Sequence, residues 1–126
     1  MLVITLTLSS TVYSYSQEIQ RVRINFSAPD NSVRQILIAF TPDNSATDDF
    51  DFGWDAVNWN SYSNDLSWMV EEYKCTIQGV GAFDINKSYP LHLLLGETGN
   101  FNIELHSIEN FNEAIDIYIY DSLLDT

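Results

Sequence analysis

Basic residues are scarce in this chain. Its 126 residues include five Lys and Arg against eighteen Asp and Glu, which gives a formal net charge of −13. A protein that binds nucleic acid needs clustered basic residues to neutralise phosphates, and an anionic membrane surface repels a chain this acidic. We therefore expect no nucleic acid partner and no membrane insertion of the mature domain. Cations, glycans and cell-surface or extracellular components remain candidate partners.

Cysteine and long apolar runs are also nearly absent. Cys75 is the only cysteine, so an internal disulfide and a multi-cysteine zinc site are both excluded. It lies in an alternating segment, which predicts a buried small hydrophobe. The longest apolar run at the N-terminus is too short to cross a bilayer as a helix. The length and the 45% hydrophobic content suit one globular domain.

Sequence signatures of catalysis are missing as well. The chain has no Gly-x-Ser-x-Gly nucleophile elbow, no metalloprotease histidine pair and no phosphate-binding loop. His92 and His106 are the two histidines, and each lies on the polar side of an alternating segment. A glycosidase with paired carboxylates needs a cleft, for which one small β-domain offers little room. We expect no enzymatic activity.

The first sixteen residues differ from the rest and allow two interpretations. Residues 2–8 are apolar and uncharged, and the small residues Ser14 and Ser16 precede Gln17. This order is typical of a signal peptide that is cleaved after residue 16, although no basic residue precedes Leu2. The alternative is a β-strand, because apolar positions alternate along residues 2–8. We predict a signal peptide over 1–16 and a domain over 17–126 that is truncated at its C-terminus.

Period-two alternation of apolar residues dominates the remainder of the chain. Val22, Ile24 and Phe26 are expected to share one face of a strand, followed by a turn at Asp30 and Asn31. Glycines beside Val80 suggest a bulge or a close backbone approach, and a single helical turn is expected at 108–111. We predict an all-β chain that forms one antiparallel β-sandwich of jelly-roll type. The expected strands are 21–26, 33–40, 66–70, 73–80, 89–95, 101–106 and 115–120.

The densest charge of one sign lies between residues 43 and 55. No Lys or Arg occurs from residue 35 to residue 73, and five aspartates fall within this loop. The pattern differs from an EF-hand, because the expected glycine and closing glutamate are misplaced, yet irregular Asp-rich loops also bind calcium. The alternatives are solvated carboxylates, carboxylates that cap their own backbone, or an edge strand with its aromatics inward. The candidate calcium ligands are Asp43, Asp48, Asp49, Asp51 and Asp55.

Aromatic residues gather in and just after this acidic loop. All three tryptophans lie between positions 54 and 68, and Trp68 sits in an apolar stretch typical of a core. Trp59 stands in polar sequence instead, which predicts exposure. Exposed aromatic rings beside Asp and Asn can stack on sugar rings, so a carbohydrate site is possible. The candidate ligand-binding residues are Trp54, Trp59 and Tyr62.

Several stretches together are similar to a known kind of module. They are residues 21–26, 34–41, 46–56, 65–69, 73–80 and 89–91, of which the string Ala-Thr-Asp-x-Phe-Asp-x-Gly-x-Asp-Ala at 46–56 is the most specific. This order resembles a β-rich module of Bacteroidetes-type secreted proteins, which usually carry a C-terminal sorting domain for type IX secretion. The resemblance implies a secreted or cell-surface location and supplies no catalytic residue. The sorting domain itself is not found in the sequence.

These observations lead to two hypotheses about function. The first is a non-catalytic accessory interaction or structural module of an exported protein, with calcium as a candidate stabilising ion. The alternative is a carbohydrate-binding module that uses the loop aromatics and aspartates. Ligand binding that depends on Trp59 would favour the alternative.

Overall fold

The computed structural model describes residues 18–126, and this part of the chain contains seven β-strands and no helix. The predicted leader over 1–16 lies outside the described residues. No helix in the described range could cross a membrane. The strands are β1 (Gln20–Ser27), β2 (Val33–Phe40), β3 (Ala56–Val57), β4 (Asp65–Val70), β5 (Tyr73–Val80), β6 (Leu91–Leu94) and β7 (Asn102–Glu109).

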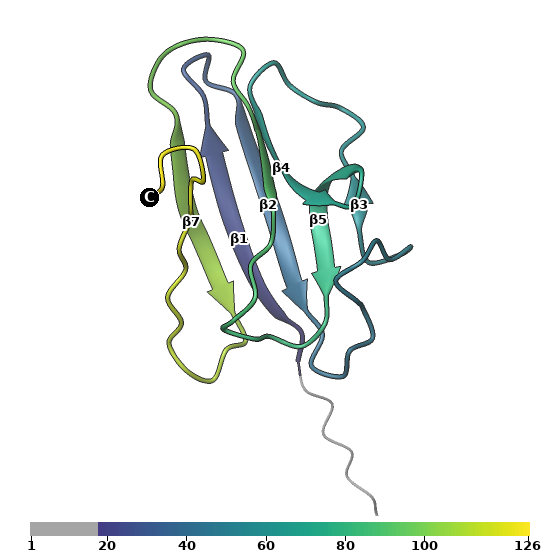
Figure 1. Cartoon of the computed structure of the whole chain (residues 1–126). Helices are drawn as coiled ribbons and strands as arrows, with labels where there is room; N and C mark the ends of the chain where they lie inside the picture. The colour runs from purple at the N-terminus through teal and green to yellow at the C-terminus, as the bar shows by residue number, and fades with distance from the viewer. Residues whose placement is uncertain (1–17) are drawn as a thin grey trace, which may run out of the picture.

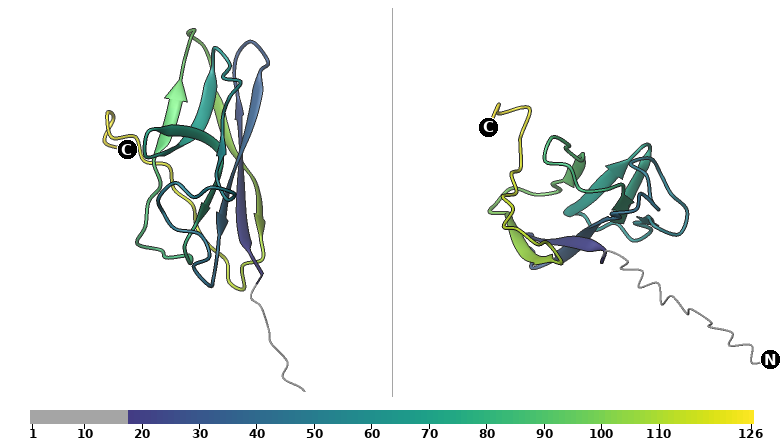
Figure 2. Two further views of the ribbon diagram at one scale, coloured as in Figure 1. Left: turned by 90° about the vertical axis from the view of Figure 1, so that its right-hand side faces the viewer. Right: turned by 90° about the horizontal axis from the view of Figure 1, so that it is seen from below.

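The seven strands join into a single hydrogen-bonded sheet. Its order is β6-β4-β5-β2-β1-β7, and the short β3 pairs with β5 on the side opposite β4. The β2–β5 pair is parallel and the other pairs are antiparallel. Figures 1 and 2 show that the sheet curls into a half-barrel. The all-β prediction is confirmed, whereas a two-sheet sandwich of jelly-roll type is not, because one continuous mixed sheet connects all seven strands.

Two hairpins predicted from the sequence are present. β1 pairs with β2 along their whole length, from Gln20 with Phe40 to Ser27 with Val33. Asn31 in the connecting turn has a φ of 66°, a backbone angle that Asn tolerates better than most residues. β4 and β5 form the second hairpin around Glu71, whose φ is 54°.

The core fills the concave side of the curled sheet. Alternate residues of β1 are buried there, as the sequence predicted, and Phe26 is completely buried and stacks on Phe101 at 6.0 Å between ring centroids. The aromatic ring of Phe40 contacts those of Phe83, Tyr89 and Phe111. The core is continuous across four strands and consists of Val22, Ile24, Phe26, Ala28, Ile36, Ile38, Phe40, Leu66, Trp68, Val70, Cys75 and Val80.

A register shift in the middle of β5 changes which residues face the core. Ala56 pairs with Ile77 and Val57 pairs with Cys75, so Thr76 has no partner on β3. This is a β-bulge, which interrupts the alternation of a strand. Cys75 is therefore fully buried, while Ile77, two residues later, is 38% exposed. Strict alternation along the sequence would have placed both on one face.

The chain departs from the predicted strands near its C-terminus. Residues 115–120 alternate apolar and polar but form no strand, and Tyr118 and Tyr120 are exposed. The helical turn predicted at 108–111 is also wrong, because β7 continues to Glu109. The strand predicted at 89–95 is shorter, at Leu91–Leu94. β6 and β7 are the two ends of the strand order in the described sheet, and residues 115–120 pair with neither of them.

Two glycines allow close approach of the acidic loop to β5, as the sequence suggested. A Cβ on Gly79 would lie 2.8 Å from Trp54 Cβ, and a Cβ on Gly81 would lie 2.9 Å from Asn44 Oδ1. The Cβ of Trp54 is fixed by its backbone, so glycine at position 79 lets the loop pack directly on β5. The Oδ1 atom of Asn44 is the end of a side chain that can move, so the contact at Gly81, just after β5, is less restrictive. These contacts hold the loop of residues 41–55 against the end of the sheet.

Cys75 is predicted to be unreactive in the native protein. Burial, followed by the nearby charge of Asp55, raises the pKa of its thiol to about 11. Because the thiolate is the reactive form, we expect Ellman's reagent at pH 8 to modify the native thiol about 100-fold or more slowly than the urea-unfolded one. Equal rates in the two states would show that Cys75 is accessible, and the denatured sample confirms that the thiol is intact.

Candidate functional site

Most carboxylates of the acidic loop, residues 41–55, accept hydrogen bonds from backbone amides. Asp43 accepts a hydrogen bond from the Ser45 amide at 3.0 Å, and Asp51 accepts from the amide and hydroxyl of Thr47. Asp55 accepts from the Asp51 amide at 2.7 Å and from the Gly79 amide at 2.8 Å. Carboxylate bonds to backbone amides fix tight turns. The loop is therefore folded by the residues that were candidate ligands.

Asp48 and Asp49 do not complete a metal site. The Asp48 carboxylate pairs with Lys87 Nζ at 2.6 Å and accepts a longer bond from the Gly81 amide at 3.3 Å. Asp49 is exposed, and its carboxylate has no hydrogen bond among the described residues. Within residues 18–126, no three His, Cys, Asp or Glu side chains gather in a way that could hold a metal ion.

The pKa shifts of Asp43 and Asp55 follow from these hydrogen bonds and from burial. Burial, partly offset by hydrogen bonds from the Asp51 and Gly79 amides, raises the pKa of Asp55. The hydrogen bonds from Ser45 lower the pKa of Asp43. The carboxylates of the five aspartates do not gather at one point in the described part of the chain, and a calcium ion needs six or more oxygens. Stabilisation by calcium stays a prediction, and melting curves in millimolar calcium and in EDTA test it.

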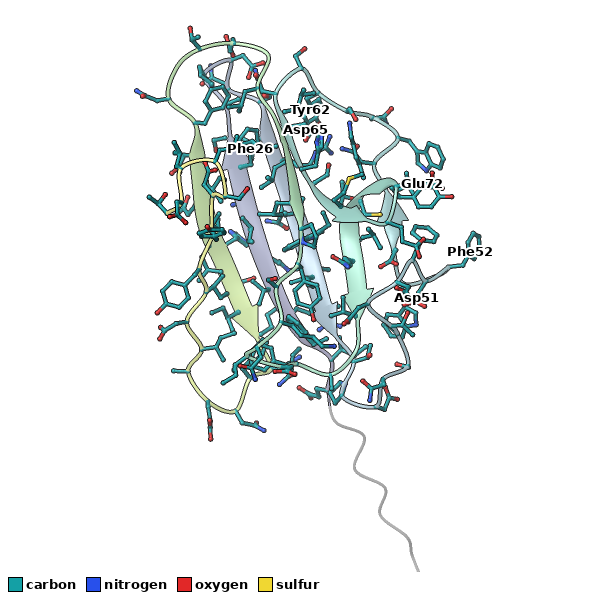
Figure 3. The ribbon with its side chains drawn as sticks, in the orientation of Figure 1. Phe26, Asp51, Phe52, Tyr62, Asp65 and Glu72 are labelled. Atoms are coloured by element: carbon teal, nitrogen blue, oxygen red, sulfur yellow. The ribbon has the colours of Figure 1, made fainter. Side chains whose placement is uncertain are left out.

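The three aromatics of the acidic loop take different directions. Phe50 packs on Tyr73 with ring centroids 4.6 Å apart, and Trp54 packs on Gly79. Phe52 points away from the protein and is 99% exposed, as Figure 3 shows. The edge-strand interpretation with all three rings inward is therefore wrong at Phe52. The cause is a turn at Asp51, whose carbonyl accepts the amides of Trp54 and Asp55.

The loop between β3 and β4 presents the other predicted ligand residues. Trp59 is 85% exposed and Tyr62 is 45% exposed. The guanidinium of Arg34 lies 4.2 Å from the centre of the Tyr62 ring, a cation–π contact that fixes this ring. Trp54 belongs to the acidic loop and is half-buried on Gly79, so the structure does not bring it together with the other two as one exposed surface. We call residues 58–64 the aromatic loop.

A buried ion pair fastens the aromatic loop to the sheet. Arg34 Nε and Nη2 donate to the two oxygens of Asp65 at 2.8 and 3.1 Å, and Nη2 also donates to the Asn60 carbonyl at 2.8 Å. Asp65, which is 4% exposed, further accepts from the Tyr62 amide and from Asn58 Nδ2. Figure 3 shows Asp65 beside Tyr62 at this end of the sheet. Bidentate pairs of this kind hold a fixed geometry.

The Arg34–Asp65 pair also explains the charge state of both side chains. Burial acts to raise the pKa of Asp65, but the hydrogen bonds from Arg34, the Tyr62 amide and Asn58 lower it overall. The bond to Asp65 raises the pKa of Arg34 against the effect of burial. Both groups are therefore charged at neutral pH. The sequence analysis did not predict this pair. Its one signal in the sequence is a single charged residue at the start of each of two apolar strands, Arg34 on β2 and Asp65 on β4.

Neither histidine joins the aromatic loop. His106 on β7 lies 3.2 Å from Asn25 Nδ2 through its Nδ1 atom, and His92 lies on β6 at the opposite edge of the sheet. The arrangement around Arg34 and Asp65 therefore offers rigid display of aromatic and amide groups, with Nε and Nη2 of Arg34 engaged in holding the loop.

Comparison with known proteins identifies the family of this chain. A family model described as a domain of unknown function (DUF8693) matches residues 8–126, so it overlaps the second half of the predicted leader. No curated protein and no solved structure matches the chain. Because the model covers nearly the whole sequence, this protein belongs to the DUF8693 family.

Proposed function

We propose that this domain is a non-catalytic interaction module of an exported or cell-surface protein, and that the aromatic loop is its contact surface. The observation that carries the proposal is Trp59, which is 85% exposed on a loop held by the buried Arg34–Asp65 pair. A large apolar ring in water costs free energy that burial against a partner would recover. The tight attachment of the loop means that little conformational entropy is lost on binding.

Export is proposed from the sequence alone. Residues 1–16 have the apolar stretch and small residues of a signal peptide. The resemblance to Bacteroidetes-type secreted modules points the same way, and the single buried cysteine is compatible with an oxidising compartment because it has no partner to pair with. A jelly-roll-like sandwich would suit such a module.

A carbohydrate is the second candidate, as the ligand of the same loop. Trp59 and Tyr62 are both exposed, and Asn60 and Ser61 lie between them with exposed polar side chains. Aromatic faces beside amides and hydroxyls suit the apolar face and the hydroxyl groups of a pyranose ring. The Arg34 contact fixes the Tyr62 ring, which is still 45% exposed.

Replacement of Trp59 tests carbohydrate binding by the aromatic loop. We expect Trp59→Ala to weaken glycan binding at least about tenfold, because exposed aromatic anchors commonly contribute more than about 1.4 kcal/mol. The measurement is a glycan array followed by calorimetric titration of each glycan that binds. Phe52→Ala is the matched control, since it removes an equally exposed ring from a different loop. Binding that is lost in the control but kept in Trp59→Ala would place the site elsewhere.

A further inference from the structure

Three of the five basic residues of this acidic chain lie on two neighbouring strands. Arg21 and Arg23 are on β1 and Arg34 is on β2. Glu109 of β7 balances the first two at N–O distances of 3.9 and 3.4 Å, and Asp65 balances the third. In a protein of net charge −13, this is the one described surface where cationic groups gather, since Lys74 and Lys87 lie on separate segments.

A hollow of about 250 Å³ lies at this surface, between β1, β2 and β5. The β2–β5 ladder includes only Leu37–Phe40 of β2, so the first half of β2 has no strand partner on the β5 side. The bulge in β5 turns Ile77 outward beside the hollow. Its lining residues are two arginines, two neutral polar residues and two apolar residues, namely Arg23, Arg34, Gln35, Thr76, Leu37 and Ile77.

The guanidinium groups of Arg23 and Arg34 each have N–H donors that make no hydrogen bond among the described residues. Arg34 uses Nε and Nη2 in the hydrogen bonds that hold the aromatic loop, and no hydrogen bond among the described residues uses its Nη1 atom. Arg23 makes one long contact, from Nε to Glu109 at 3.4 Å, and its terminal nitrogens likewise have no partner among residues 18–126. Planar guanidinium donors of this kind recognise carboxylate and sulfate oxygens.

Arg34 connects the hollow with the aromatic loop. It lines the hollow, it lies 4.2 Å from the centre of the Tyr62 ring, and it donates to the Asn60 carbonyl. A ligand that stacks on the exposed aromatics of residues 58–64 therefore has a cationic subsite within reach of the same side chain. This inference rests on the second candidate function, the binding of a carbohydrate.

We propose that the hollow binds the anionic group of an acidic saccharide, a carboxylate or a sulfate, whose neighbouring sugar stacks on the aromatic loop. Arg23 and Arg34 contact the anion, Gln35 and Thr76 contact sugar hydroxyls, and Leu37 and Ile77 contact the apolar edge of the ring. The volume suits one sugar unit. The overall charge of −13 repels a dense polyanion, so short acidic oligosaccharides bind better than long ones.

The test uses a matched pair of ligands and a matched pair of variants. The ligands are tetragalacturonate and its methyl ester, which share every sugar contact and differ in the carboxylate charge. The variants are Arg23→Gln, which alters the hollow, and Arg21→Gln, which removes the same charge two residues away without lining it. Melting curves first establish that both variants are folded, and calorimetric titration then gives each dissociation constant.

We expect the wild type to bind the acid about tenfold more tightly than the ester. Arg23→Gln should weaken binding of the acid about five- to tenfold and leave the ester unchanged, and Arg21→Gln should change neither, in keeping with the strength of charge-assisted bonds. A sulfated galactan tetrasaccharide identifies the anion, because its preferential binding assigns a sulfate to the hollow. Equal binding of acid and ester, with Arg23→Gln neutral, would overturn the acidic subsite.

The two proposals fail in different ways. Loss of ester binding in Trp59→Ala supports the carbohydrate function even when acid and ester bind equally, so only the acidic subsite would then be rejected. Absence of binding to the acid, the ester and the sulfated ligand rejects the subsite for all three, and the glycan array then decides the carbohydrate function separately.

Discussion

Phe26→Ala is expected to lower the free energy of unfolding by about 3 to 5 kcal/mol. Phe26 is completely buried on the concave face, near the end of β1, and stacks on Phe101. Its removal forfeits the transfer free energy of the ring and leaves a cavity that the surrounding strands can fill only in part, because their backbones are fixed in the sheet. For a domain of this size the melting temperature should fall by roughly 15 to 30 °C.

Differential scanning calorimetry measures this effect, and Phe52→Ala is its control. Phe52 undergoes the same chemical change but is 99% exposed, so its variant should melt within about 0.5 kcal/mol of the wild type. Should Phe26→Ala fail to fold, Phe26→Leu gives a smaller change in the same direction. Similar melting temperatures for the two alanine variants would mean that Phe26 is not in the core.

Arg34→Ala should destabilise the protein by about 3 kcal/mol at pH 7, because it leaves the buried Asp65 carboxylate without its cation. Asp65 is 4% exposed, and the remaining donors from Tyr62, Asn58 and the Leu66 amide only partly replace the bidentate contact. Chemical denaturation at pH 7 gives the difference. The aromatic loop should also loosen, which faster proteolysis near Trp59 would report.

The same variant has an expected dependence on pH. Because the folded-state pKa of Asp65 is lowered, its contribution to stability is present above the unfolded value, near 3.8, and is lost as the pH falls through the folded value. The difference between wild type and Arg34→Ala should therefore be largest at neutral pH and shrink below about pH 4. A difference that stays constant down to pH 3 would contradict the ion-pair explanation.

Lys87→Ala is the control for Arg34→Ala. It removes a cation whose distance to its carboxylate is as short, 2.6 Å from Lys87 to Asp48, but both of those side chains are 41% exposed. Water and salt already screen such a pair, so its loss should cause little change. If the two variants were equally destabilised, the burial of Arg34 and Asp65 would not be the cause.

Titration of Asp55 affects the stability of the protein in the opposite direction to titration of Asp65. The folded-state pKa of Asp55 is raised, mainly by burial, so ionisation of this group is less favourable in the folded chain than in the unfolded one. Its contribution to stability is present below the unfolded value and is lost as the pH rises through the folded value. The acid limb of the stability curve therefore reflects several aspartates, among them Asp43, Asp55 and Asp65, and Arg34→Ala isolates the part due to Asp65.

Local sequence patterns were sufficient for the strands that lie in the middle of the sheet. β2 was predicted with the observed bounds, and the hairpins and the inward face of β1 followed from alternation and turn residues. These signals work because side chains alternate across a strand and because Asp30 and Asn31 favour a tight turn. The buried state of Cys75 followed from the same pattern, in spite of the bulge beside it.

Alternation failed where a strand needs a neighbour that the sequence does not specify. Residues 115–120 have the same pattern as β1, yet they form no ladder, because a strand exists only when another strand supplies its hydrogen bonds. The parallel β2–β5 pair, which joins segments far apart in the chain, likewise has no local signature.

The sequence by itself determined an acidic, all-β domain with a core of alternating apolar residues, since composition and period are local properties of the chain. The tertiary structure alone decided the site. It directed the carboxylates of Asp43, Asp51 and Asp55 to backbone amides, left Phe52 in water, and brought Arg34 to Asp65 across 31 positions of sequence. Such contacts depend on how distant segments are brought together when the sheet curls, and short-range patterns carry no information about that geometry.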